Sequence, residues 1–255
     1  MPETLHPPSA DALARVRPLF TGTYPVPVRL WAMLDGVVSP RLVVDDAEAP
    51  TWALLQELAE GTVYIGGGPG PERLSSAIHA LRQWQDVVIC AWPAAGFPLA
   101  SLPAPDYRGM AVDFTCRSPT GDLAALTPLP PHYELRRLEP AMLPLLDGFD
   151  YYVAMFGSAE AALQGTVGYY VAHAGEIVAE AVAGPFARGI AEIGVGTKPQ
   201  HRGRGLATAA AARLLQACEE LGFRPLWNAA QHNAPSVALA RRLGFVIEQP
   251  FEVYA

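Results

Sequence analysis

The stretch that decides the fold runs from Ile190 to Leu215 and reads IAEIGVGTKPQHRGRGLATAAAARLL. An apolar run leads into a basic, glycine-containing turn, and an alanine-rich helical pattern follows at once. A strand, a glycine turn and a helix in immediate succession expose backbone N–H groups at a helix N-terminus, where the helix dipole favours negative charge. Glycine lets the backbone approach a ligand closely, and Arg202 and Arg204 add positive charge. The stretch therefore predicts a phosphate-binding turn, with a basic turn that binds nothing as the alternative.

The spacing of this turn differs from the common phosphate loops. It lacks the Gly-Lys-Ser/Thr ending of a P-loop and the third glycine of a dinucleotide fingerprint. It reads Gln-x-x-Gly-x-Gly-x-Ala from Gln200 to Ala207 instead. Downstream lie Asn233-x-x-Ser236-x-x-Leu239 and then Leu243-Gly244-Phe245. The two patterns together resemble the GNAT superfamily of N-acetyltransferases over residues 131 to 255.

A narrower resemblance rests on the residues around the turn. Glu192-Ile193-Gly194 before it, Trp227-Asn228 after it and the segment from Asn233 to Phe245 are similar to the subgroup that includes zwittermicin-resistance-type acetyltransferases. The N-terminal half of that subgroup would match residues 1 to 130.

The second half of the chain predicts a clear order of elements. The dipeptide Ala174-Gly175 between two β-branched runs is typical of an antiparallel hairpin. Asn233 is a favourable N-cap, and Gly222 and Gly244 follow helical patterns as C-caps do. We expect strands at 132–138, 167–173, 176–182, 190–197, 226–229 and 246–254, and helices at 139–149, 206–221 and 233–243. The predicted fold class is α/β (α+β), a mixed sheet flanked by helices, and the resemblance implies the GNAT fold for 131–255.

The first half predicts an additional α/β domain over residues 1–130. We expect paired strands at 30–34 and 41–44, strands at 62–65, 86–92 and 107–116, and helices at 51–59 and 72–84. The proline-rich segment 93–105 reads as a loop, and 118–131 as the domain boundary. The turn Gly66-Gly67-Gly68-Pro69-Gly70 has no basic or hydroxyl residue, so a plain connection is favoured over a phosphate site. Three roles for this half stay open: a degenerate copy of the same fold, a substrate lid, or a dimerisation surface.

Composition narrows the class of protein. The 255 residues are 51% hydrophobic, enough for a sizeable core, and the net charge of −7 disfavours nucleic acid or an anionic membrane as the main partner. The sequence contains no run of roughly 18 to 20 apolar residues and no apolar run of signal-peptide length at its start. The three cysteines match no metal or redox spacing and fit a reducing compartment. We expect a cytoplasmic protein without a metal site.

The resemblance implies acetyl-coenzyme A as cosubstrate and assigns roles to residues of the motif. The strand around Val195 would supply a backbone N–H for the oxyanion, and Val195 and Thr197 would pair with the pantetheine amides through their main chain. A fixed oxyanion donor of this kind is worth roughly 3 kcal/mol. Cofactor binding is expected at Val195, Thr197, Gln200, Arg202, Gly203, Arg204, Gly205, Leu206, Ala207, Thr208, Asn233 and Ser236.

Amide formation from an amine requires a proton acceptor, because an alkyl ammonium group has a pKa near 10. Glu192 is the candidate general base, since strand alternation places it on the same face as Gly194 and Gly196. A salt-bridge partner or solvated carboxylate is the alternative. Many GNAT enzymes have a tyrosine one residue after the position of Leu239 as general acid; here that residue is Ala240.

The acid is therefore open: the alternatives are another side chain, with His232 and Tyr254 as candidates, a water molecule, or departure of the thiolate without an acid. Ser236 is a candidate hydroxyl near the thiolate or behind the site, with simple exposure as the alternative. His201 is expected to be solvated and His173 to be structural. The leading functional hypothesis is acetyl transfer to a primary amine of a small molecule by direct attack on the thioester, in a possible homodimer. The alternatives are a peptide or protein acceptor, and a non-catalytic coenzyme A-binding module.

Overall fold

The computed structural model describes residues 2–22, 28–91, 108–115 and 122–255. The described strands form one sheet of 12 strands in the order β1-β2-β3-β4-β5-β12-β6-β11-β10-β9-β8-β7. The strands are β1 (Glu3–Leu5), β2 (Arg41–Val44), β3 (Trp52–Gln56), β4 (Thr62–Gly67), β5 (Val88–Ala91), β6 (Arg108–Thr115), β7 (Tyr133–Arg137), β8 (Val167–His173), β9 (Glu176–Ala187), β10 (Ile190–Thr197), β11 (Arg224–Ala230) and β12 (Val246–Tyr254). The α-helices are α1 (Ala10–Val16), α2 (Val28–Leu34), α3 (Pro71–Arg82), α4 (Phe149–Phe156), α5 (Ala159–Gly165), α6 (Leu206–Glu220) and α7 (Ala234–Arg242). Short 3₁₀ turns are η1 (Arg17–Phe20), η4 (Leu123–Leu126), η5 (Pro140–Leu145) and η6 (Pro199–His201).

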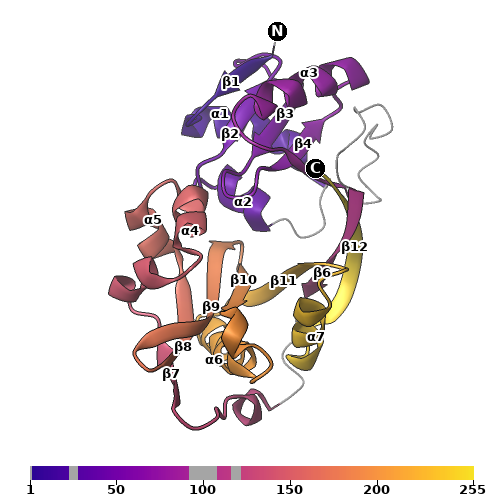
Figure 1. Cartoon of the computed structure of the whole chain (residues 1–255). Coiled ribbons are helices and arrows are strands. Elements are labelled where there is room, and N and C mark those ends of the chain that lie inside the picture. Colours follow the sequence, from indigo (N-terminus) through magenta and orange to yellow (C-terminus); the bar gives the residue numbers. More distant parts are fainter. Residues whose placement is uncertain (1, 23–27, 92–107, 116–121) are drawn as a thin grey trace.

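The strand order is the same read from either end of the sheet. Strands β1 to β5 run inward from one end and β7 to β11 from the other, and the last strand of each half is exchanged at the centre. Thus β12 pairs with β5, and β6 pairs with β11. Figure 1 shows β12 extending from the lower half of the molecule, where the preceding helix α7 lies, into the upper half. Each half therefore needs a strand of the other to continue its sheet.

The two halves also share a local plan at the start of their parallel strand pairs. Residues 61–68 read GTVYIGGG and residues 189–196 read GIAEIGVG. Gly61 and Gly189 both have a φ near 73°, and the carbonyl of each accepts the first N–H of the neighbouring parallel strand, from Val88 and Arg224. Tyr64 consequently occupies in the first half the position that Glu192 occupies in the second.

Three apolar clusters form the core. One lies under α3 in the first half, one under α6 in the second, and the third joins the halves between α1, α2, α4 and the sheet. In β3 the side chains alternate between two of these clusters, so that both faces of the strand are buried. Among the described residues, no helix has the length and apolar character that a membrane crossing requires.

Most elements expected in the second half are present. The Ala174-Gly175 hairpin joins β8 and β9 with both turn residues at positive φ, 50° and 84°. Helix α6 and strands β10 and β11 lie where the pattern placed them, and α7 begins after the Asn233 cap. The segment 139–149 is mostly the 3₁₀ turn η5, because Pro144 interrupts it, and α4 and α5 were not expected.

Two predictions for the first half are wrong. Residues 30–34 belong to α2, not to a strand, because Asp35-Gly36 ends a helix: Gly36 has a φ of 73° and the Val37 N–H returns to the Ala32 carbonyl. Residues 51–59 contain strand β3, not a helix, since a strand buried on both faces shows no alternation in sequence. The expected loop 93–105 lies outside the described residues, as does part of the boundary 118–131.

Candidate functional site

The sheet opens between β10 and β11. Their parallel pairing runs from Ile190–Arg224 to Glu192–Leu226 and stops there. Beyond it, β10 stays with β9 and β11 stays with β6. Within the described strands, the facing edges of 193–197 and 227–230 therefore have no ladder partner. Backbone N–H and C=O groups on such an edge are available to an extended ligand, as they are to an added strand.

The glycine turn continues this open edge into a helix N-terminus. Gly203 and Gly205 have φ angles of 75° and 76°, a left-handed conformation that glycine adopts without a steric penalty. The space that a Cβ would enter at either glycine is empty to 4 Å. Gly205 is the N-cap of α6, whose first N–H groups, from Leu206 on, have no acceptor within the helix. The turn thus presents backbone donors to an open surface at the positive end of a 15-residue helix.

The two arginines of the turn are held by different partners. Arg202 Nε donates to the carbonyl of Thr197 at 3.3 Å, and Arg204 Nη1 donates to the hydroxyl of Tyr133 at 3.0 Å. That hydroxyl also lies 3.0 Å from Nδ1 of His201, and the Tyr133 ring stacks on His173 with a centroid distance of 4.5 Å. Strand β7, the first strand of the second half, therefore supports the turn through Tyr133. The rings of His173 and His201 pack against the Tyr133 ring. Sequence reasoning did not identify Tyr133, because no local signal connects it with the turn.

Helix α7 directly follows β11, the strand on the other side of the opening. Asn233 Oδ1 accepts from the backbone N–H of Ser236 at 3.3 Å, which confirms Asn233 as a cap. The Ser236 hydroxyl accepts from the indole N–H of Trp227 at 3.1 Å, and Trp227 itself is fully buried. Ala240 is also fully buried. The Ser236 side chain thus satisfies a buried donor on β11.

Glu192 lies in the sheet with both carboxylate oxygens engaged. Arg29 of α2 donates from Nε to Oε2 at 2.8 Å and from Nη2 to Oε1 at 2.6 Å. Glu192 is only 8% exposed. A bidentate guanidinium occupies the lone pairs that a base would use. In this structure Glu192 is therefore a salt-bridge partner, which was the alternative to its role as general base.

Arg29 is the centre of a buried polar cluster between the halves. Its Nη1 contacts Glu60 at 2.6 Å and Glu57 at 3.6 Å, and its Nη2 also donates to the Tyr151 hydroxyl at 2.8 Å. Burial lowers the pKa of Arg29, but the charge and hydrogen bonds of Glu192 outweigh this and raise it well above the usual value. Burial raises the pKa of Glu57, and Arg29 only partly offsets that effect. One guanidinium therefore ties together three carboxylates from both halves.

A second carboxylate faces the open part of β10. Glu180 of β9 is the register partner of Gly196, and its carboxylate lies 3.4 Å from where a Cβ on Gly196 would stand. Burial, and then the nearby charge of Asp147, raise the pKa of Glu180 to about 7. Glu180 and Asp147 line a hollow of about 250 Å³ together with Gly196 and Arg202. This hollow thus touches the last residues of β10 and the glycine turn.

Tyr152 of α4 covers the same part of the sheet. Its hydroxyl is 3.3 Å from where a Cβ on Gly194 would stand. Burial and the charge of Glu180 raise its pKa, so the phenol is protonated at neutral pH. The small residues at 194 and 196 therefore make room for Tyr152 and Glu180, and no local sequence pattern predicts either contact.

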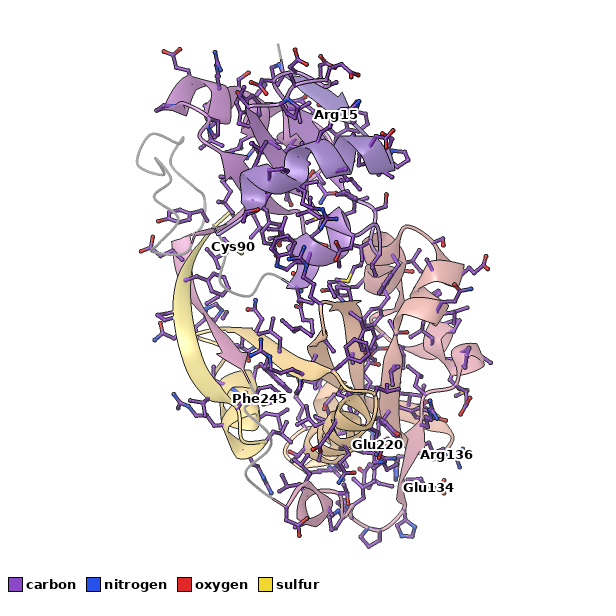
Figure 2. All side chains as sticks on the ribbon, turned by 180° about the vertical axis from the view of Figure 1, so that it is seen from behind. Arg15, Cys90, Glu134, Arg136, Glu220 and Phe245 are labelled. Carbon is purple, nitrogen blue, oxygen red and sulfur yellow. The ribbon has the colours of Figure 1, made fainter. Side chains whose placement is uncertain are left out.

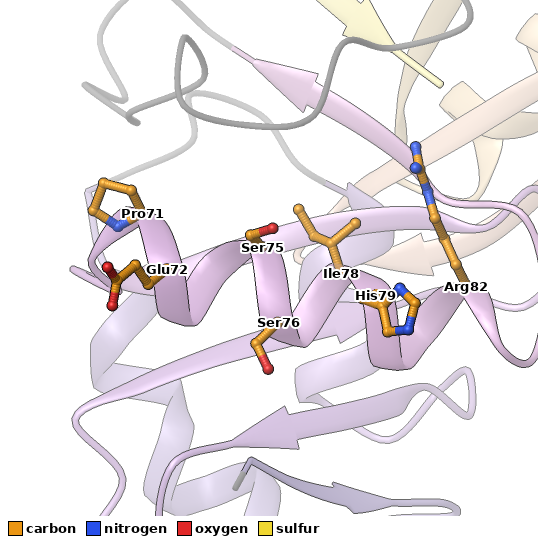
Figure 3. A pocket seen from close by; sticks show the side chains of 7 residues that line it. All are labelled: Pro71, Glu72, Ser75, Ser76, Ile78, His79 and Arg82. Carbon is orange, nitrogen blue, oxygen red and sulfur yellow. The ribbon is translucent and has the colours of Figure 1, made fainter.

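Other features lie away from this opening. A wider hollow of about 610 Å³ follows α3 in the first half, and Figure 3 shows that its lining side chains, such as Ser75 and His79, project from that one helix. Tyr254 packs against the apolar cluster under α3 and is not brought to the motif. Figure 2 places Cys90 in the same half. Cys218 is a free thiol, and burial raises its pKa to about 11. In the part of the chain that the structure describes, no cluster of three metal-ligating side chains occurs.

Comparison with solved structures supports one fold over both halves. A GCN5-related N-acetyltransferase-like protein from Streptococcus suis 89/1591 matches with a TM-score of 0.75 and 24% identity, over 96% of this chain and 98% of the other. A tandem GNAT protein from the clavulanic acid biosynthesis pathway matches with a TM-score of 0.67 and 15% identity, over 100% and 98% of the two chains. The likeness to these structures establishes a mixed α/β GNAT fold.

Sequence comparison identifies the family. A curated relative from Bacillus subtilis (strain 168), the uncharacterized N-acetyltransferase YdfB, is 29% identical over 128 residues, which is 49% of each protein. The chain thus matches about half the length of that relative. The family model described as GNAT acetyltransferase matches residues 121–254, which is more than half of the chain and includes the opening, the glycine turn, α6 and α7. The chain belongs to the GNAT acetyltransferase family.

Proposed function

We propose that this chain is an acetyl-coenzyme A-dependent N-acetyltransferase that transfers the acetyl group to a primary amine of a small molecule. The observation that carries the proposal is the continuity of the open edge of β10 with the N-terminus of α6. An extended pantetheine arm fits an unpaired strand edge, and a pyrophosphate fits the helix N-terminus that directly follows it.

The cofactor contacts follow from this placement. The pyrophosphate is held by backbone N–H groups of 203–208, with the guanidinium of Arg202 beside them and Gln200 in the preceding turn. The pantetheine amides pair with the main chain of Val195 and Thr197, and the N–H of Val195 receives the oxyanion. Asn233 and Ser236 fix the α7 side of the cleft, through the cap and the Trp227 contact.

A small amine is favoured as acceptor by the hollow beside Gly196. Its volume of about 250 Å³ suits a small molecule, and Glu180 and Asp147 on its wall attract an ammonium group. The similarity of 192–194 and 227–228 to zwittermicin-resistance-type acetyltransferases points in the same direction, and we keep that subgroup as the narrower assignment. The free thiol of Cys218 fits a protein that works in the reducing cytoplasm.

The first half, residues 1–130, is proposed to be a copy of the fold that has no cofactor cradle. Between β4 and α3 it has only the turn Gly68-Pro69-Gly70, without a basic side chain, where the second half has η6 and the basic turn. Its contribution to the site is Arg29, which reaches across to Glu192.

Calorimetry with two matched variants tests the cofactor assignment. Gly203→Glu and Gly222→Glu introduce the same charge at glycines with φ angles of 75° and 76° and open surroundings, so their backbone cost is alike. Only the first lies at the proposed pyrophosphate site. We expect Gly203→Glu to abolish measurable acetyl-coenzyme A binding and Gly222→Glu to leave the Kd unchanged. Equal effects of the two variants would refute the cradle.

Thiol release on addition of amines then tests the transfer. The acceptors glucosamine, tyramine, lysine and an unblocked tetrapeptide separate a small-molecule enzyme from a peptide enzyme. Acetylation of the tetrapeptide alone would favour the peptide alternative. Tight binding of acetyl-coenzyme A without turnover on any amine would favour a non-catalytic module.

A further inference from the structure

Two carboxylates flank the open part of β10, and the chemistry of amide formation requires one proton acceptor there. Glu192 is fixed by two hydrogen bonds from Arg29 and belongs to the last parallel pair, with Leu226, where the sheet is still closed. Among the described residues, the carboxylate of Glu180 has no hydrogen-bond or ion-pair partner. Of the two, Glu180 alone has lone pairs free for a substrate.

The position of Glu180 agrees with the path of the thioester. Ala181 is the register partner of Val195 and Glu180 that of Gly196, so the Glu180 carboxylate lies next to the strand segment proposed to hold the thioester carbonyl. The missing side chain at Gly196 leaves the space in front of the carboxylate open. A Cβ there would stand 3.2 Å from Glu180 Cγ. An amine in that space would meet the carboxylate and the thioester together.

The surroundings of Glu180 keep it from forming a competing ion pair. Asp147 lies on the rim of the hollow, just after η5. Tyr152 of α4 and Tyr170 of β8 lie next to Glu180 on the neighbouring elements. The cations of the hollow, Lys198 and Arg202, stand elsewhere, because Lys198 pairs with Glu176 and Arg202 donates to Thr197. The exposed Leu145 adds an apolar rim next to Asp147.

We propose that Glu180 is the catalytic proton acceptor of this protein and that Asp147 guides a cationic primary amine to it. The inference rests on the proposed acetyl transfer and names its base and the charge of its acceptor. The ammonium group enters past Asp147 and gives one proton to the Glu180 carboxylate. The nitrogen lone pair then attacks the thioester carbon, forming the C–N bond.

Collapse of the tetrahedral intermediate completes the balance of atoms. The C–S bond breaks and its electron pair goes to sulfur, while the second nitrogen proton leaves with the thiolate to give free coenzyme A thiol. Glu180 returns its proton to water. The raised pKa of Glu180, about 7, suits a base that must accept a proton near neutral pH and release it again.

The decisive variant is Glu180→Gln, which keeps the size of the side chain and removes the base. We expect kcat/KM to fall by about 100-fold or more at pH 7 and the acidic limb of its pH profile near pH 7 to disappear, with the Kd for acetyl-coenzyme A unchanged. The matched control is Glu219→Gln, an exposed carboxylate near the C-terminal end of α6 and away from the hollow, which should leave the rate and the profile as they are. A Glu180→Gln rate within twofold of the unaltered protein would overturn the inference.

A second measurement does not depend on finding the acceptor. Carbon-13 NMR of labelled glutamate side chains should show one carboxyl signal that titrates near pH 7, and this signal should be absent from the spectrum of Glu180→Gln. Titration of the Glu180 carboxyl near pH 4.5 would overturn the inference. Failure of the proposed function is recognised separately, since the unaltered protein would then not bind acetyl-coenzyme A.

Discussion

Arg29 and Glu192 form a bidentate ion pair, 2.8 and 2.6 Å, between residues 163 positions apart in the chain. The pair joins α2 of the first half to β10 of the second at the point where the parallel strands separate. It therefore fixes both the contact between the halves and the beginning of the opening.

Arg29→Gln should strongly destabilise the protein. It leaves Glu192 and Glu57 buried without a counter-charge, and loss of one partner of a buried pair costs about 3–5 kcal/mol. Urea denaturation measures the free energy of unfolding. The control is Arg15→Gln, which breaks the exposed pair with Glu48 and should cost less than about 1 kcal/mol. The combined replacement Arg29→Met with Glu192→Met should recover part of the lost free energy of unfolding. Similar losses for Arg29→Gln and Arg15→Gln would contradict a stabilising role of the buried Arg29 ion pairs.

Ser236→Ala should lower stability and leave the cofactor affinity largely intact. The change leaves the buried indole N–H of Trp227 without its acceptor, at a cost of about 1–3 kcal/mol. In the double variant with Trp227→Phe, the cost of Ser236→Ala should nearly vanish, because the donor is also gone. Urea denaturation of the four proteins of this cycle checks it. Loss of turnover without loss of stability would place the Ser236 hydroxyl in the chemistry instead.

The stability of the protein should fall as pH rises through the range set by Glu180. The carboxyl titrates near 4.5 when unfolded and near 7 when folded, so between these values the folded state binds the extra proton and loses stability with rising pH. Above pH 7 the loss is complete, at about 1–3 kcal/mol after allowance for partial exposure. Glu180→Gln should therefore be more stable than the unaltered protein at pH 8. Denaturation curves at pH 5 and pH 8 test this, and an equal fall in both proteins would assign the dependence to other groups.

The sequence predicted the parts of the site that are local in the chain. The strand, glycine turn and helix from Ile190 to Leu215 each follow from neighbouring residues, and so does the Asn233 cap. The hairpin at Ala174-Gly175 is local in the same sense. Short-range hydrogen bonding and periodicity determine all of these, which is why they were predictable.

Contacts between distant segments left no signal of that kind. Arg29 lies in the run VRLWAML, which gives no hint of Glu192, and Glu180 lies in an ordinary alternating strand. The role of Glu192 depends on Arg29, and that of Glu180 on the glycine opposite it in the sheet. The exchange of β6 and β12 between halves is likewise a tertiary feature, since either strand reads the same whichever neighbour it pairs with.

One acetyl-coenzyme A should bind per chain, although the described strands include two parallel pairs that separate, β4 with β5 and β10 with β11. The pairing of β4 with β5 ends after Val63–Ile89, but the ring of Phe20 fills the space at Gly66, where a Cβ would stand 2.8 Å from it. The following turn, Gly68-Pro69-Gly70, offers no positive charge. Calorimetry should therefore give a stoichiometry of one, and Gly203→Glu should remove binding altogether. Residual binding in Gly203→Glu, or two molecules per unaltered chain, would show that the first half binds the cofactor as well. Phe20→Ala should create no second site, because removing the ring supplies no donor for a phosphate.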